Sequence, residues 1–160
     1  MAPAQSSPIP PPGTRLRTSD WGWVLAYGLR GLGELVRARL IFARLQAADI
    51  PHRNHTAALA ARAGAPVMAD SMVARIGYVL PRISARLPWR SDCLIQAIAA
   101  QNWLTAKGLA SAIRIGGERH ETTGFDAHAW LVHNEQVVTG GDIARYHLLL
   151  AENPGEPAGS

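Results

Sequence analysis

The spacing of apolar residues changes once along this chain, near Gly108, and this change limits the folds that it can adopt. Before Gly108, apolar residues recur every three or four positions, which is the period of a helix with one apolar face. After it they alternate with a period of two, the pattern of half-buried strands. The segments that alternate are 112–116, 125–133 and 136–139. Helices followed by strands predict an α+β fold in which helices pack on a small antiparallel sheet.

Composition divides the chain into four parts. Residues 1–19 hold many prolines and little to bury, so we expect a disordered tail, and residues 152–160 predict a second flexible tail. Between them we expect an N-terminal helical segment, 20–66, and a compact core, 67–151. The hydrophobic fraction of 48% and the charged fraction of 18% are those of an ordinary globular chain.

The N-terminal segment predicts one long helix that begins after Ser19 or Asp20 and ends near Ala48. Its apolar face is formed by Leu25, Leu29, Leu32, Val36 and Leu40. Glycines in a helix favour close packing against a neighbouring helix, and this one has Gly22, Gly28, Gly31 and Gly33. Residues 49–66 predict a loop with at most a short helix. A second helix follows from Val67, and we expect Pro81 to kink or divide it.

Several classes of protein fit the sequence poorly. The net charge of +4 comes from scattered arginines without interleaved aromatic residues, which argues against nucleic-acid binding. Charged residues interrupt the apolar stretch 21–48, so no membrane span is expected. A single cysteine, Cys93, cannot form an internal disulfide, and a reduced thiol without a signal peptide predicts a cytoplasmic protein. We expect no cofactor.

Cys93 is the candidate nucleophile. It follows Ser91 and Asp92, two residues that favour helix starts, and it opens a stretch with helical apolar spacing. Unpaired N–H groups and the positive end of the helix dipole favour thiolate over thiol in the first turn. The alternative is that Cys93 is a small buried apolar residue.

His128 is the candidate base. Alternation along the strand 125–133 places it on one face with Asp126 and Trp130. If the cysteine helix packs on that face, the imidazole can take the thiol proton. Asp142, which follows the next strand, is the candidate third residue that orients the ring. Gln96 and the backbone N–H of Cys93 are candidate oxyanion donors, and Trp130 a candidate shield against water.

A set of short motifs resembles the transglutaminase-like leader peptidases of lasso-peptide biosynthesis, the B proteins of lasso-peptide gene clusters. The resemblance covers roughly residues 67–150, and the N-terminal helical segment also looks like that family's N-terminal part. It rests on Cys93-Leu94-Ile95-Gln96-Ala97, Ile113-Arg114-Ile115-Gly116, Ala127-His128-Ala129-Trp130-Leu131 and Val137-Val138-Thr139-Gly140-Gly141.

The resemblance implies a papain-like Cys-His-Asp cysteine peptidase. Such an enzyme removes the leader from a ribosomally made lasso precursor peptide, so that a separate ATP-dependent cyclase can close the macrolactam. Cys93 and His128 carry over directly, whereas the position expected for the aspartate holds Gly140, and Asp142 or a backbone group would replace it. Because no leader-recognition domain is recognisable, a separately encoded leader-binding protein is an implied partner.

Three other functions remain open from the residues alone. A Cys-His site can transfer an acyl group to an amine instead of water. The chain can also be a non-catalytic adaptor that binds a peptide at a sheet edge. A metal hydrolase using His52 and His55 is the weakest, since a zinc site needs at least three ligands and no acidic or cysteine cluster lies nearby.

Overall fold

The computed structural model describes residues 21–61, 69–89, 92–120 and 124–150. Four α-helices precede the strands: α1 is Trp21–Phe42, α2 is Ile50–Leu59, α3 is Ala69–Ser84 and α4 is Cys93–Ala106. A short 3-10 helix, Ala47–Asp49, leads into α2. The strands are β1 (Ala112–His120), β2 (Gly124–His133), β3 (Gln136–Thr139) and β4 (His147–Leu150). They form one antiparallel sheet in the order β3-β2-β1-β4, which confirms the α+β fold.

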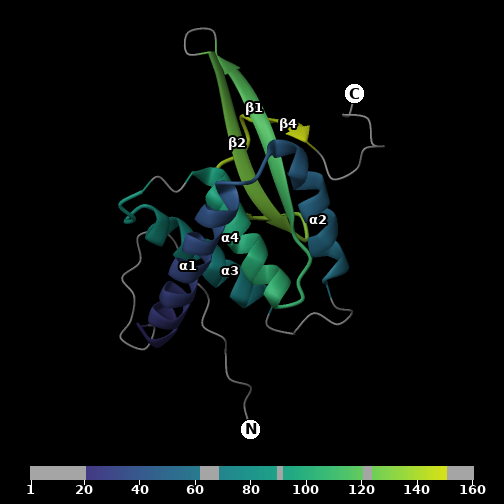
Figure 1. Cartoon of the computed structure of the whole chain (residues 1–160). Helices are drawn as coiled ribbons and strands as arrows, with labels where there is room; N and C mark the ends of the chain where they lie inside the picture. The colour runs from purple at the N-terminus through teal and green to yellow at the C-terminus, as the bar shows by residue number, and fades with distance from the viewer. Residues whose placement is uncertain (1–20, 62–68, 90–91, 121–123, 151–160) are drawn as a thin grey trace.

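The helices cover one side of the sheet, and the β1–β2 hairpin projects beyond them (Figure 1). Helix α4 is central: Ile95, Ile98 and Leu104 are fully buried, and alanines between them let neighbouring elements approach closely. Side chains from α1, α3, β1, β2 and β3 complete this core. Helices α1 and α4 therefore share one hydrophobic core with the sheet.

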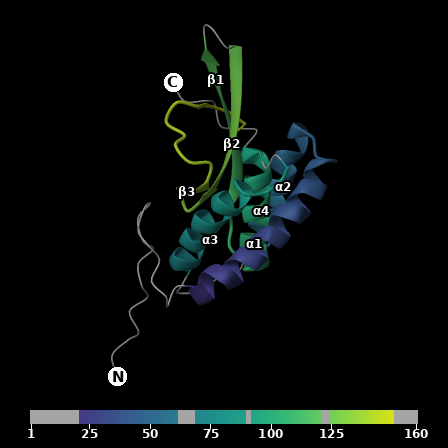
Figure 2. The same cartoon turned by 90° about the vertical axis from the view of Figure 1, so that its left-hand side faces the viewer.

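The two faces of β2 have different surroundings, as the alternation predicts. Leu131 joins the main core beneath the helices, whereas Trp130 and Val132 form a second cluster with Ile143 and Tyr146. The segment that leads from β3 to β4 lies on the side of the sheet opposite the helices (Figure 2). The condition that the cysteine helix packs on the His128 face is therefore not met, because α4 packs on the Leu131 face.

Helix α1 is buried on a different face from the expected one. Gly31, Glu34, Leu35 and Ala38 are its buried residues. The face expected to be buried is exposed, with Leu25, Leu29 and Leu40 between 64% and 66% accessible. Small residues occupy the buried face of α1 because they let this helix lie close to α3. A Cβ on Gly31 would come within 3.2 Å of Ile83 Cδ1. Of the four glycines, this one alone has the close neighbour that we expected.

Other local predictions differ from the structure in extent. The segment predicted as mainly loop contains α2 as a regular helix, and α3 continues past Pro81 without division. Strand β1 is longer than expected, and β4 was not predicted at all. The turn between β2 and β3 is tight: Asn134 and Glu135 both have positive φ, 48° and 61°, which joins the two antiparallel strands closely. The predicted tails lie outside the described residues.

Candidate active site

Cys93 is the first residue of α4 and is partly exposed. Asp92 occupies the N-cap with an extended backbone (φ −60°, ψ 163°), and its carbonyl accepts the first helical hydrogen bond, from Gln96 N at 3.1 Å. The thiol therefore lies at the end of the helix where backbone N–H groups lack helical acceptors and the dipole is positive. This confirms the predicted helix start.

The edge of β2 holds the sulfur. Strand β3 pairs with β2 only as far as Thr139, which lies opposite Leu131, so within the described part of the chain no strand pairs with β2 before Leu131 on that side. The N–H of Ala129 uses this opening and donates to Cys93 Sγ at 3.3 Å. Ala129 follows His128 directly, so the thiol of the candidate nucleophile lies against the backbone next to the candidate base.

The His128 ring has a defined tautomer. Its Nε2 lies 2.6 Å from the carbonyl oxygen of Gly140. A carbonyl oxygen only accepts hydrogen bonds, so Nε2 carries the proton and Nδ1 has the free lone pair in the neutral ring. Tyr146 stacks on the same ring at 4.7 Å between centroids, and Trp130 lies at 6.3 Å. Among the described residues, no hydrogen bond joins the ring to Cys93 Sγ; such bonds often form only when substrate binds.

Gly140 can be nothing but glycine in this arrangement. Its φ is +117°, and a Cβ there would lie 2.3 Å from Trp130 Cβ. Without a side chain at Gly140, the backbone can turn away from β3 and the Gly140 carbonyl can reach His128. The position where the lasso-peptidase resemblance expects an aspartate is thus filled by a backbone acceptor.

Asp142 lies elsewhere. Its Oδ1 accepts a hydrogen bond from Ala144 N at 3.0 Å, within its own exposed loop. The structure therefore does not bring Asp142 into a hydrogen bond with the His128 ring, and its role as the third residue stays a prediction.

Tyr146 is a site residue that sequence reasoning missed. Its hydroxyl donates to Asp126 Oδ2 at 3.0 Å and accepts from Arg145 Nη2 at 2.6 Å. That hydrogen bond to Tyr146, with the attraction of Glu118 and Asp126, raises the pKa of Arg145. Asp126, which shares the face of His128, therefore holds the hydroxyl of the tyrosine that stacks on the imidazole. No local sequence signal identifies Tyr146, because its position depends on how the loop after β3 folds back.

The two remaining predicted residues have different surroundings. Gln96 Nε2 donates to Ser84 Oγ at 3.0 Å, so this amide hydrogen is directed toward α3. Trp130 is 4% exposed and lies beside the imidazole, where it can form a wall of the site.

His52 and His55 are exposed on α2, and within the described residues they join no cluster of three or more ligand-type side chains.

Comparison with known proteins places the chain in a family. A family model described as the transglutaminase-like superfamily matches residues 34–151, which include α4, the sheet and the loop after β3. No curated protein and no solved structure matches the chain. None of the helices in the described parts is both long and apolar enough to cross a membrane. The match covers well over half of the sequence and contains Cys93, His128 and Gly140, and the chain belongs to the transglutaminase-like superfamily.

Proposed function

We propose that this chain is a cysteine peptidase that removes the leader from a lasso precursor peptide. The observation that carries the proposal is the contact of Cys93 Sγ with Ala129 N at 3.3 Å, next to an imidazole held in its Nε2–H form. A thiol at a helix start and a histidine with a free Nδ1 are the two groups that acyl chemistry on a peptide bond requires. The motif resemblance supplies the substrate.

The reaction begins with transfer of the Cys93 proton to His128 Nδ1. The thiolate then attacks the scissile carbonyl carbon, and the backbone N–H of Cys93, with Gln96 as a further donor, stabilises the oxyanion. Collapse of this intermediate breaks the C–N bond, while His128 returns its proton to the departing amine of the core peptide. A thioester joins the leader to Cys93.

Water completes the cycle. His128 takes a proton from water as the oxygen attacks the thioester, and the leader leaves as a carboxylic acid while the thiol is restored. Attack by an amine in place of water would give acyl transfer. In the proposed pathway a separate leader-binding protein delivers the precursor, and an ATP-dependent cyclase uses the freed amine. This chemistry needs a reduced thiol, which fits a cytoplasmic setting.

Cleavage of a leader–core precursor, with and without its small leader-binding protein, tests the proposal by mass spectrometry. We expect the wild type to make one cut with addition of water, and Cys93→Ala and His128→Ala to make none. His52→Ala is the matched control, since it removes an exposed histidine on α2 and should leave cleavage unchanged. Full cleavage by Cys93→Ala overturns the mechanism. Cellular function and peptide binding that survive Cys93→Ala identify an adaptor, and a product joined to an amine identifies an acyltransferase.

A further inference from the structure

Helix α1 presents apolar side chains to solvent along most of its length. Six of them, between 38% and 66% exposed, lie on the side away from its buried residues. We call this surface the outer face of α1: Trp21, Leu25, Leu29, Leu32, Val36 and Leu40. A folded domain rarely leaves so many large apolar side chains contiguous in water, and such patches mark interaction sites.

A hollow at one end of the outer face can receive an anchoring side chain. It has a volume of about 290 Å³ and is lined by Val36, Arg39, Leu40 and Trp89. The indole Nε1 of Trp89 is buried and has no hydrogen-bond partner among the described residues. An aromatic ring beside an apolar pocket is the usual composition of an energetically dominant contact in an interface.

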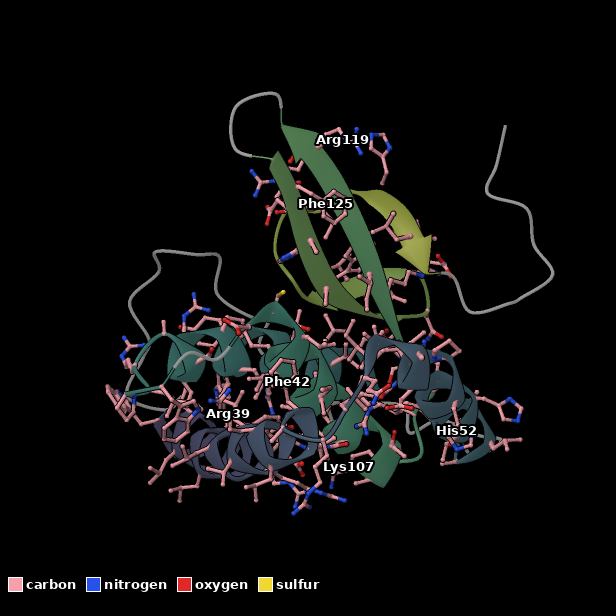
Figure 3. The ribbon with its side chains drawn as sticks, turned by 45° about the horizontal axis from the view of Figure 1, so that its top comes forward. Arg39, Phe42, His52, Lys107, Arg119 and Phe125 are labelled. Carbon is pink, nitrogen blue, oxygen red and sulfur yellow. The ribbon has the colours of Figure 1, made fainter. Side chains whose placement is uncertain are left out.

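The charges around the outer face are positive. The acidic residue of α1, Glu34, is buried and paired with Arg30 at 2.6 Å, so it adds no negative charge to the surface. Arg39 is exposed and lines the hollow with Val36 and Leu40, and Arg37 is exposed on the flank of α1 that faces α2. Figure 3 shows Arg39 on α1 and His52 on α2 at opposite sides of the helical layer. A second copy of this chain would place arginines against arginines, whereas an acidic partner would complement them.

The glycines of α1 favour a helical partner over a lipid surface. A Cβ added to Gly22, Gly28 or Gly33 would meet nothing within 4 Å. Each glycine costs a helix about 1 kcal/mol relative to alanine, a cost that close approach of another backbone can offset. The outer-face leucines are spaced by four and three residues, as in the seam between two packed helices.

We propose that the outer face of α1 docks an amphipathic helix of a separate protein, with acidic residues beside its apolar seam. Leucines of the partner pack along the outer face, one large side chain fills the hollow beside Trp89, and carboxylates pair with Arg37 and Arg39. The surface lies on the side of α1 away from the core, and the inference does not depend on the proposed peptidase activity.

Two synthetic helical peptides test the proposal on the full-length chain by fluorescence anisotropy. Both have leucine at the seam positions; one has flanking glutamates and the other flanking lysines. We expect the wild type to bind the glutamate peptide at least about tenfold more tightly, and Leu29→Glu to weaken that binding about tenfold or more. Leu59→Glu is the matched control, because Leu59 is 73% exposed on α2. The double variant Arg37→Glu with Arg39→Glu should prefer the lysine peptide, and circular dichroism checks that each variant is folded.

Other occupants give different results, and each would overturn the proposal. Equal binding of the two peptides, or binding of neither, removes the acidic helix as occupant. A dimer that Leu29→Glu dissolves, measured by light scattering, identifies a second copy. Flotation with phosphatidylglycerol vesicles that Leu29→Glu abolishes, without peptide discrimination, identifies a membrane surface.

Discussion

Replacing Gly140 by alanine should destabilise the protein more than any other single-methyl addition in the loop after β3. The new Cβ would lie 2.3 Å from Trp130 Cβ and 3.0 Å from Trp130 Cα, where no atom can fit without movement of β2 or of the loop. The backbone also has a φ of +117°, which residues with a side chain rarely adopt.

The expected magnitude follows from these two effects. A non-glycine residue held in a disfavoured backbone region costs about 1–3 kcal/mol. Forcing a methyl group into occupied space costs about 1–3 kcal/mol more. We therefore expect Gly140→Ala to lower the free energy of unfolding by about 2–6 kcal/mol, a large part of the 5–15 kcal/mol typical of a domain.

Gly141 provides a matched control for this measurement. Its φ is also positive, +66°, but a Cβ there would meet nothing within 4 Å. Gly141→Ala should cost only about 1–2 kcal/mol, the penalty for the backbone region alone. Urea unfolding of both variants separates the collision from the backbone strain. If Gly140→Ala costs no more than Gly141→Ala, the close approach of Gly140 to Trp130 is not part of the native state.

Three further outcomes are expected. Nitrogen-15 NMR should find neutral His128 protonated at Nε2. It should find neutral His133 protonated at Nδ1, because His133 Nδ1 lies 2.5 Å from the carbonyl oxygen of Ala110. An Nδ1–H form of His128 would refute the tautomer assignment. Tyr146→Phe should keep most of the precursor cleavage because the stacked ring remains, whereas Tyr146→Ala should lower the rate about tenfold; equal rates would remove the ring from the site. Asn54→Ala should lower the free energy of unfolding by about 2–5 kcal/mol in urea, because the Asn54 amide bonds both the N–H and the carbonyl of Ile113 at 2.8 and 2.9 Å; a loss below about 1 kcal/mol would contradict this.

The parts of the fold that sequence predicts well are those with strong local causes. Asp92 at an N-cap followed by helical spacing places Cys93 at the start of α4, and alternation over 125–133 separates Leu131 from Trp130 and Val132, although both faces are buried at this end of β2. These patterns depend on residues close together in sequence, so they survive folding unchanged. Strand β4 has no such pattern: its pairing with β1 begins after a loop whose course depends on tertiary contacts.

The orientation of α1 shows why periodicity alone can choose the wrong face. Leucines at helical spacing predict a buried stripe, yet the interior receives Gly31, Glu34, Leu35 and Ala38. Three of these four are small or charged, and a hydropathy pattern gives them little weight. The close approach of α1 to α3 determines which face is buried, because two helices can pack at short distance only where their side chains are small. A helix that is apolar on both sides therefore leaves the choice of interior face to its neighbours.

The orienting acceptor of the imidazole could not be selected from side chains. Sequence reasoning compares carboxylates, and Asp142 stays its prediction for the third residue; every residue has a carbonyl, and only the fold decides which carbonyl reaches His128. Here the ending of β3 and the positive φ of Gly140 decide it. A carbonyl has no net charge, so it fixes the tautomer but stabilises an imidazolium less than a carboxylate would. In the proposed mechanism, the groups that can stabilise charge at the sulfur are then the helix start and the Ala129 N–H.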